Sequence, residues 1–314
     1  MLIRIEHFRD VHTHASAVIG WQQFYSQLLP GNPDSALLQL SNDRIHIFRE
    51  RFGQRIVQHG AAPRGKICFA IPMEVPGSLC VQGKNVESSS IFVLHGGQEF
   101  VLHLPRYMDI LAITLDKQEF ARVTQEDYRA DDILSMLKRP VISVATPELE
   151  RAKARILSAC EEACCQQDDD GASTASGFLE STVIDALVCL CEHARTGARA
   201  RHLISGRGFI VERCHMIAMT EPSTPPTVDD LSARLRVSRR TIQNAFLVVT
   251  QTKPNAYLKS IRLNQVRASL INTTLSDLNV SRAATDWGFG HFGHFSADYR
   301  KLFAELPSQT RRRS

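Results

Sequence analysis

The residues best suited to specific chemistry follow Ser238, where a turn meets a predicted helix. The side chains expected on the outward face of this helix are all polar: Ser238, Arg239, Arg240, Thr241, Gln243 and Asn244. Arginine can bond O6 and N7 of guanine bidentately, and glutamine or asparagine can do the same to N6 and N7 of adenine. An ordinary solvated face would also carry acids, and this segment has none. It therefore predicts a helix whose first turns read base edges in the major groove.

The surrounding residues have the pattern of a helix-turn-helix, which we expect over about 227–250. Thr227 is a suitable N-cap, and Asp229 and Asp230 lie in the first turn, where the helix dipole favours anions. Apolar residues recur at helical spacing on both sides of the turn: Val228, Leu231, Leu235, Ile242, Ala245, Phe246 and Val249. Arg236 stands at the turn position where glycine is commonest, so a left-handed conformation there would be strained.

A second helix-turn-helix is predicted over about 278–303, with Gly288 supplying its left-handed turn. The residues expected on its outward face are mostly aromatic or small: His291, Phe292, Gly293, Ser296, Ala297 and Arg300. This set is poor at reading bases, so we expect the second unit to position the protein and the first to discriminate between sequences. His291 and His294 have no third ligand nearby in the sequence, so no metal site is predicted there.

One helix over about 254–271 should join the two units, beginning at Pro254. Its length of about 27 Å is close to the roughly 34 Å between successive major grooves on one face of DNA. Lys259, Arg262 and Arg267 fit either phosphate contacts or an ordinary solvated helix face. The arginines at 311–313 add attraction to DNA that is independent of its sequence.

Residues 206–311 resemble the DNA-binding domain of the AraC/XylS family of bacterial transcription regulators. The resemblance rests on three motifs: Ala284-x-x-Trp-Gly-Phe289, His294-Phe-Ser-x-x-Tyr-Arg-x-Leu-Phe303 and Pro307-Ser308. It implies promoter DNA and RNA polymerase as partners. It also implies base reading by Arg240, Gln243 and Asn244 and by the face from His291 to Ala297. Ala297 stands where the family often has arginine, which weakens base reading by the second unit, and Ala304 stands where the family usually has glycine.

Residues 1–200 are expected to form an N-terminal effector-sensing and dimerisation domain with its linker, and residues 201–314 the DNA-binding domain. Short apolar or alternating runs between about 35 and 120 are typical of an antiparallel β-sandwich or jelly roll. The expected strands are 36–40, 45–48, 67–71, 90–94, 100–104 and 110–115. The expected helices are 20–29, 116–138, 147–166 and 178–195, with a loop at 168–177 and an interdomain linker at 196–202. The predicted fold class is therefore α+β.

The N-terminal half more weakly resembles the ethanolamine-operon type of regulator within this family. The matching segments are Gly20-Trp-Gln-Gln-Phe-Tyr-Ser-Gln-Leu-Leu-Pro-Gly31, Ile47-Phe-Arg-Glu50, Phe69-Ala-Ile-Pro72 and Gly96-Gly-Gln-Glu-Phe100. The resemblance implies a domain that senses a small molecule and often forms a homodimer. The ethanolamine regulator responds to ethanolamine with a cobalamin cofactor, and neither ligand is carried over to this chain.

An effector pocket needs an apolar wall with a few converging polar groups. The candidates for such a pocket are Trp21, Phe48, Arg49, Glu50, Phe69, His95 and Glu99. Ordinary core packing is the alternative for each aromatic residue, and a surface ion pair is the alternative for Arg49 and Glu50. His12 and His14 are expected to be solvated or hydrogen-bonded rather than metal ligands.

Charge is distributed unevenly along the chain. Residues 201–314 carry 17 Lys+Arg against 8 Asp+Glu, a net charge of +9, so residues 1–200 carry −5 within the total of +4. A basic C-terminal part indicates that this end meets a polyanion. No apolar run reaches the roughly 18 residues that cross a bilayer, and the N-terminus lacks the pattern of a signal peptide. We therefore expect a cytoplasmic protein with mostly buried cysteines, and we predict neither a cofactor nor a metal.

Three functions remain open from the sequence. The first is a transcriptional regulator, an activator, that responds to a small-molecule effector. The second is a regulator that acts without a ligand. The third is a metal-dependent enzyme tethered to DNA, for which the β domain offers His46, His59, His95 and His103 but no His-x-His pair within a predicted strand.

Overall fold

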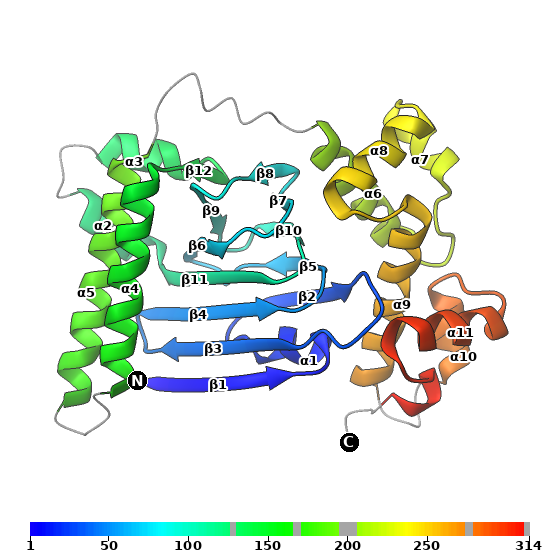
Figure 1. Ribbon diagram of the computed structural model, residues 1–314, viewed down its shortest axis with the longest axis horizontal. Coiled ribbons are helices and arrows are strands. Elements are labelled where there is room, and N and C mark those ends of the chain that lie inside the picture. The colour runs from blue at the N-terminus through cyan, green and yellow to red at the C-terminus, as the bar shows by residue number, and fades with distance from the viewer. Residues whose placement is uncertain (126–129, 166–170, 195–205, 274–278, 311–314) are drawn as a thin grey trace.

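Two β-sheets lie between a pair of long helices on one side and the C-terminal helices on the other (Figure 1). The computed structural model describes residues 1–125, 130–165, 171–194, 206–273 and 279–310. The named strands pair antiparallel throughout the described residues. Sheet A has the strand order β1-β3-β4-β11-β6-β9-β12, and sheet B the order β2-β5-β10-β7-β8. The structure thus confirms the predicted α+β class with an antiparallel N-terminal domain.

The strands of sheet A are β1 (Leu2–Phe8), β3 (Ser35–Ser41), β4 (Ile45–Phe52), β6 (Lys66–Glu74), β9 (Ser90–His95), β11 (Met108–Asp116) and β12 (Val141–Ser143). The strands of sheet B are β2 (Gln22–Gln27), β5 (Ile56–Ala61), β7 (Leu79–Val81), β8 (Lys84–Val86) and β10 (Glu99–Leu104). The helices of this half are α1 (Val11–Ala17), α2 (Lys117–Gln125), α3 (Ala130–Leu137), α4 (Thr146–Cys165) and α5 (Gly171–Glu192). All six predicted strands fall within strands of the structure.

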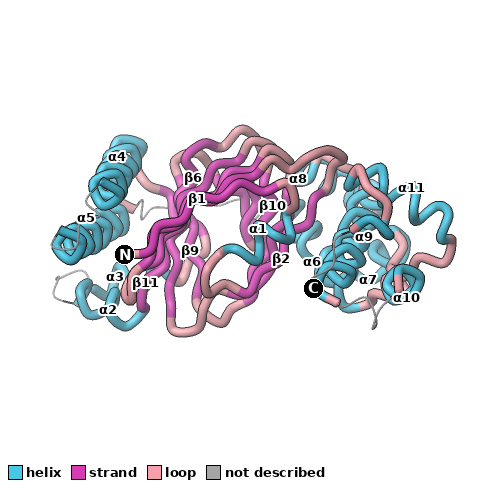
Figure 2. The backbone as a smooth tube through the Cα atoms, turned by 90° about the horizontal axis from the view of Figure 1, so that it is seen from below, coloured by secondary structure: helices cyan, strands magenta, loops and turns pink. Residues whose placement is uncertain are grey.

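The central strands β6, β9 and β11 of sheet A are buried on both faces, because α4 and α5 cover one face and sheet B covers the other. Successive side chains of a strand point to opposite faces. Ile47 and Val93 pack towards α4 and α5, whereas their neighbours Phe48 and Phe92 pack towards sheet B. Figure 2 shows these layers edge-on, with α4 and α5 beyond sheet A and the C-terminal helices beyond sheet B. The near-continuous apolar runs of β6 and β11 follow from this burial on both faces.

The predicted helix over 20–29 is wrong, because this segment contains the strand β2. Residues 22–27 pair in antiparallel register with β5. Trp21 and Tyr25 both pack in the apolar core between the sheets. Aromatic residues suit a half-buried strand, and pairing with β5 outweighs any local helical preference.

The predicted loop at 168–177 is partly wrong, because α5 begins at Gly171. The side chain of Ala175 is buried, and α5 packs along α4. Glycine, serine and threonine have low helix propensity, which lowers the stability of a helix. Packing of an apolar face against a neighbouring helix stabilises it by a larger amount. The linker predicted at 196–202 lies outside the described residues.

The C-terminal part is all helical. Its helices are α6 (Gly206–Thr220), α7 (Val228–Leu235), α8 (Arg239–Thr250), α9 (Pro254–Asn272), α10 (Val280–Asp286) and α11 (Phe292–Phe303), with a short 3₁₀ helix at Pro307–Gln309. The first helix-turn-helix shares its apolar core with sheet B. Val57 and Val101 belong to the same apolar cluster as Val211, Phe246 and Tyr257. Within the described residues, no helix has both the length and the apolar character that a membrane crossing requires.

Candidate DNA-binding interface and effector cavity

The first helix-turn-helix consists of α7 and α8, and side-chain caps fix the start of each helix. Thr227 Oγ1 accepts from the Asp230 N–H at 3.2 Å, and the Asp230 carboxylate accepts from the Thr227 N–H at 2.9 Å, which is a capping box. Ser238 Oγ accepts from the Thr241 N–H at 3.1 Å. The predicted N-cap Thr227 is confirmed, and Ser238 is the N-cap of α8. Arg236 ends α7 with φ of 53°, so this turn residue adopts the left-handed conformation that the sequence marked as strained.

The outward face of α8 carries the residues predicted to read bases. All of them are exposed: Ser238, Arg239, Arg240, Thr241, Gln243 and Asn244. Arg239 is paired with Asp229 of α7, which holds its guanidinium against the protein. Among the described residues, no acidic side chain forms an ion pair with Arg240. Arg240, Gln243 and Asn244 are therefore the side chains of this face best placed to meet a base pair.

The second helix-turn-helix, α10 and α11, has a similar framework and a different outward face. Asn279 Oδ1 accepts from the Arg282 N–H at 2.7 Å and caps α10. Gly288 has φ of +71°, as predicted for the turn. The predicted outward residues are exposed except for Ser296, which is half-buried: His291, Phe292, Gly293, Ser296, Ala297 and Arg300. The arginines at 311–313 lie outside the described residues.

Helix α9 joins the two units and contributes to both cores. Tyr257 and Ile261 pack in the first unit, whereas Leu263 and Leu270 pack in the second. The 19 residues of α9 correspond to a rod of about 28 Å. This helix therefore holds the two recognition helices α8 and α11 at a separation set by its length.

The three cations of α9 all have partners within the protein. Lys259 Nζ donates to Asp298 at 2.8 Å, and the guanidinium of Arg262 lies 4.7 Å from the ring centre of Phe289. Arg267 is 11% exposed and pairs with Asp10 at 2.7 Å and with Glu305 at 2.6 Å. Burial would lower the pKa of Arg267, but the Asp10 and Glu305 carboxylates raise it above its usual value. Arg267 is thus a buried bridge between the two halves rather than a phosphate contact.

Contacts between α9 and the edge strand β2 were not predicted. Asn264 Nδ2 donates to the Gln27 carbonyl at 2.9 Å, and Asn264 Oδ1 accepts from the Gln27 N–H at 3.0 Å. Ser260 Oγ donates to the Leu28 carbonyl at 3.2 Å. These bonds satisfy backbone groups that an edge strand leaves open. In the sequence, polar residues on a helix also fit a solvated face, so no local signal pointed to this contact.

A buried histidine cluster forms a further part of this domain boundary. His103 Nε2 of β10 and His215 Nδ1 of α6 each lie 2.9 Å from the Tyr257 hydroxyl of α9. His59 lies beside His215, with ring centres 5.5 Å apart and the rings tilted by 59°. Burial lowers the pKa of His103 to about 3 and that of His59 to about 4. These rings are therefore uncharged at pH 7, so burying them does not carry the free-energy cost of burying a charge.

Three of the predicted effector residues line one cavity between the sheets. Its polar groups are Trp21, Gln23, Glu50 and Gln58, set in an apolar wall of Phe48, Cys68, Ala70, Phe92, Leu94, Phe100, Leu102, Ile110 and Ala112. The volume is about 20 Å³, enough for about one water molecule. The Glu50 carboxylate accepts from the Tyr25 hydroxyl at 2.5 Å and from Gln58 Nε2 at 3.3 Å, and it lies 3.2 Å from His14 Nε2. The buried Trp21 Nε1 has no hydrogen-bond partner in the described residues.

The other predicted effector residues lie elsewhere. Arg49 makes two hydrogen bonds of 2.8 Å to Asp109. It therefore forms an ion pair, as the alternative interpretation expected, but its partner is Asp109 and not Glu50. Phe69 is core on the helix side of sheet A, where it contacts Phe120. His95 Nε2 lies 2.9 Å from the Leu137 carbonyl. Glu99 lines a separate cleft of about 620 Å³ between sheet B and α6.

The histidines considered as metal ligands do not form a ligand group, although His59 and His103 both lie near His215. His46 bonds Gln39, and His103 bonds Tyr257. His12 and His14 are buried rather than solvated, and His14 stacks on Phe52 with its Nδ1 2.9 Å from Ser35 Oγ. Within the described residues, none of the strand histidines belongs to a group of three potential ligands.

The helix-turn-helix region matches known proteins. A model described as a helix-turn-helix domain matches residues 231–313. The XylDLEGF operon transcriptional activator 2 of Pseudomonas putida is 36% identical over 112 residues, which are 34% of this chain and 71% of that protein. The regulator CdhR of Pseudomonas aeruginosa is 35% identical over 120 residues, 38% of this chain and about a third (34%) of its own length.

A solved AraC-type regulator from Chromobacterium violaceum is 26% identical, with a TM-score of 0.32, over 34% of this chain and 93% of that chain. The resemblance to the ethanolamine-operon type finds no support among these relatives. The matched part contains both recognition helices, α8 and α11, and most of the P. putida activator. The chain therefore belongs to the AraC/XylS family of DNA-binding transcriptional regulators, a family of regulators rather than of enzymes.

Proposed function

We propose that this regulator activates transcription in response to a small-molecule effector bound in the cavity around Glu50. The observation that supports this proposal is that two buried polar groups line one apolar cavity. They are the carboxylate of Glu50 and the indole N–H of Trp21, which has no hydrogen-bond partner in the described residues. A few polar groups in an apolar wall are the usual composition of a ligand site. The P. putida relative is named an activator, which favours activation over repression.

The strand β2 connects this cavity to the DNA-binding part. Gln23 lines the cavity, and Tyr25 bonds Glu50, while Gln27 at the end of the same strand bonds Asn264 of α9. A ligand larger than water requires the cavity walls to separate, and β2 forms one of these walls. Displacement of β2 would strain the Gln27–Asn264 pair and thus change the balance between docked and released α9. The effector then acts through its different affinity for these two states.

The experiment is a titration of promoter DNA by fluorescence anisotropy, with and without small amines, amino alcohols, cobalamins and aromatic acids. Thermal shift with the same panel identifies binders, because a ligand of the folded state raises Tm with dose. Glu50→Gln should abolish the response, and Glu99→Gln is the matched control, because it makes the same change outside the cavity.

A regulator that needs no effector is the second candidate, because the cavity has room for only about one water molecule. If no compound changes Tm, DNA affinity or transcription, this second candidate replaces the first. If Glu99→Gln abolishes the response and Glu50→Gln leaves it intact, the effector binds in the cleft beside α6 instead.

A further inference from the structure

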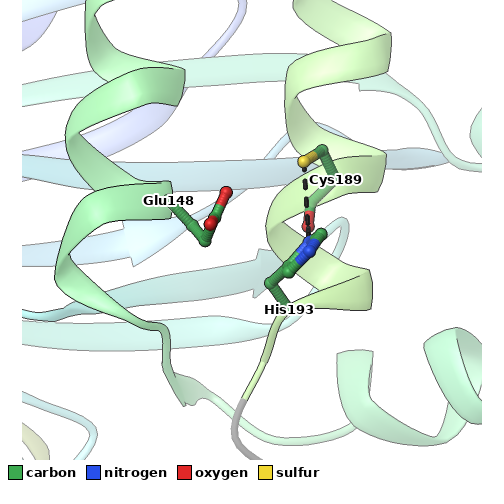
Figure 3. A group of neighbouring side chains, drawn as sticks. All are labelled: Glu148, Cys189 and His193. Atoms are coloured by element: carbon green, nitrogen blue, oxygen red, sulfur yellow. Dashed lines mark hydrogen bonds between the residues drawn. The ribbon is translucent and has the colours of Figure 1, made fainter.

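A separate group of side chains lies where the start of α4 meets the end of α5 (Figure 3). Glu148 is in the first turn of α4, Cys189 is in the last turn of α5, and His193 follows that helix directly. One ligand atom from each residue lies within 4.8 Å of the other two. In the part of the chain that the structure describes, this is the one set of three potential metal ligands that comes together.

The spacing within this group fits a tetrahedral ion. Cys189 Sγ and His193 Nδ1 are 3.6 Å apart. Typical Zn–S and Zn–N bonds of about 2.3 and 2.1 Å at a tetrahedral angle place the two ligand atoms about 3.6 Å apart as well. The Glu148 carboxylate completes the set after a shift of about 1 Å. Residues four apart on a helix face the same way, which explains why Cys189 and His193 meet.

We propose that Glu148, Cys189 and His193 bind a zinc ion, with water as the fourth ligand. Thiolate, imidazole and carboxylate are the donors that zinc takes in proteins. Binding releases the thiol proton of Cys189 to solvent, and the thiolate and carboxylate together balance the charge of the ion. Cys189 is half-buried and His193 is exposed, so an ion can enter and keep its water.

Two existing contacts compete with the metal. Arg151 holds both carboxylate oxygens of Glu148, at 2.8 Å each. His193 Nδ1 lies 2.9 Å from the Cys189 carbonyl, and this contact gives way when the ring nitrogen becomes a ligand. The site would tie the first turn of α4 to the last turn of α5, at the end of α5 that leads to the DNA-binding part. Bound metal should therefore stabilise the helix pair.

The test uses the full chain, stripped with a chelator and titrated with Co²⁺, whose thiolate charge-transfer and ligand-field bands report sulfur ligation and geometry. Zn²⁺ should then displace Co²⁺ and raise Tm with dose. We expect one ion per chain in the wild type. Cys189→Ser should remove the thiolate band, and Glu148→Gln should weaken binding by about tenfold or more.

The matched control is Cys165→Ser, which removes an exposed thiol from the far end of α4, about 25 Å along the helix. It should leave Co²⁺ binding unchanged. Arg151→Ala frees the Glu148 carboxylate and should tighten binding, whereas a merely adventitious thiol site would not respond to it. Circular dichroism of each variant establishes that it folds. The proposal is overturned if Cys189→Ser keeps the thiolate band, if Cys165→Ser removes it, or if the wild type binds no ion.

Discussion

The two helix-turn-helix units share a framework and differ in the chemistry of their outward faces. In both, a polar N-cap begins the first helix and a face of α9 completes the core. The outward face of α8 presents Arg240, Gln243 and Asn244, whereas that of α11 presents Phe292, Gly293 and Ala297. The framework depends on buried residues, so the outward face can change freely. Sequence discrimination should therefore depend mainly on the first unit.

The units also differ in how they meet the N-terminal domain. The first unit packs on sheet B through apolar side chains and the buried histidines around Tyr257. The second unit has its own core and is held by the polar bridge of Arg267 with Asp10 and Glu305. The stability of the first unit's contact should depend on pH, because it contains histidines. The stability of the second unit's contact should depend on the charge of Arg267. The following predictions test this comparison.

The largest expected effect is on DNA recognition by the first unit. Arg240→Ala with Gln243→Ala removes two bidentate readers worth about 1–3 kcal/mol each, so affinity for the cognate promoter should fall by about 30-fold or more at physiological salt. Anisotropy titrations with cognate and scrambled DNA measure it. His291→Ala in the second unit should weaken binding to both DNAs slightly and to a similar degree. An equal loss on cognate and scrambled DNA for the first-unit variant would contradict base reading.

The next effect concerns the bridge that holds the second unit. Arg267→Ala leaves Asp10 and Glu305 without their partner in a site that is mostly buried, so unfolding free energy should fall by about 3 kcal/mol. Lys259→Ala removes an exposed pair with Asp298 and should cost less than about 1 kcal/mol. Urea denaturation at low and high salt measures both. Equal losses for the two variants would show that burial of Arg267 does not matter.

Acid should destabilise the docking of the first unit. The folded pKa of His103 is about 3 and that of His59 about 4, below the ordinary value of 6.5, because burial disfavours the charged ring. The unfolded chain takes up protons first, so stability is full above pH 6.5 and falls between about pH 6 and 4. Each histidine contributes a slope of up to about 1.4 kcal/mol per pH unit. Urea denaturation from pH 7 to 4.5 measures the slope, which His103→Gln should reduce. An unchanged slope in that variant would exclude His103 as a source.

The smallest effects come from the left-handed helix ends. Ala304 ends α11 with φ of 61°, and Arg236 ends α7 with φ of 53°. A left-handed backbone conformation costs a residue with a Cβ about 1–2 kcal/mol. Glycine avoids this cost, but it loses more conformational entropy on folding, which offsets part of the gain. Ala304→Gly and Arg236→Gly should each raise the unfolding free energy by about 0.5–1 kcal/mol. Thermal melts monitor both, and a lower Tm would refute the strain at that position.

The local sequence determined the DNA-binding half. N-caps at Thr227 and Ser238, a left-handed Gly288 and the apolar spacing along α9 are all patterns within one or two helical turns. The outward residues of α8 follow from the same periodicity, since the inward positions are apolar. The departures of Ala297 and Ala304 could also be identified from the motif alone.

Only the tertiary structure decided the N-terminal site and its link to DNA binding. Segment 20–29 becomes a strand through pairing with β5, and that pairing places Trp21 and Gln23 beside Glu50. Arg49 and Glu50 are neighbours in sequence, yet the pleat sends them to opposite faces of sheet A. Gln27 and Asn264 lie 237 positions apart and still bond. Such contacts depend on how sheets and helices stack, and local periodicity contains no information about partners so distant in the chain.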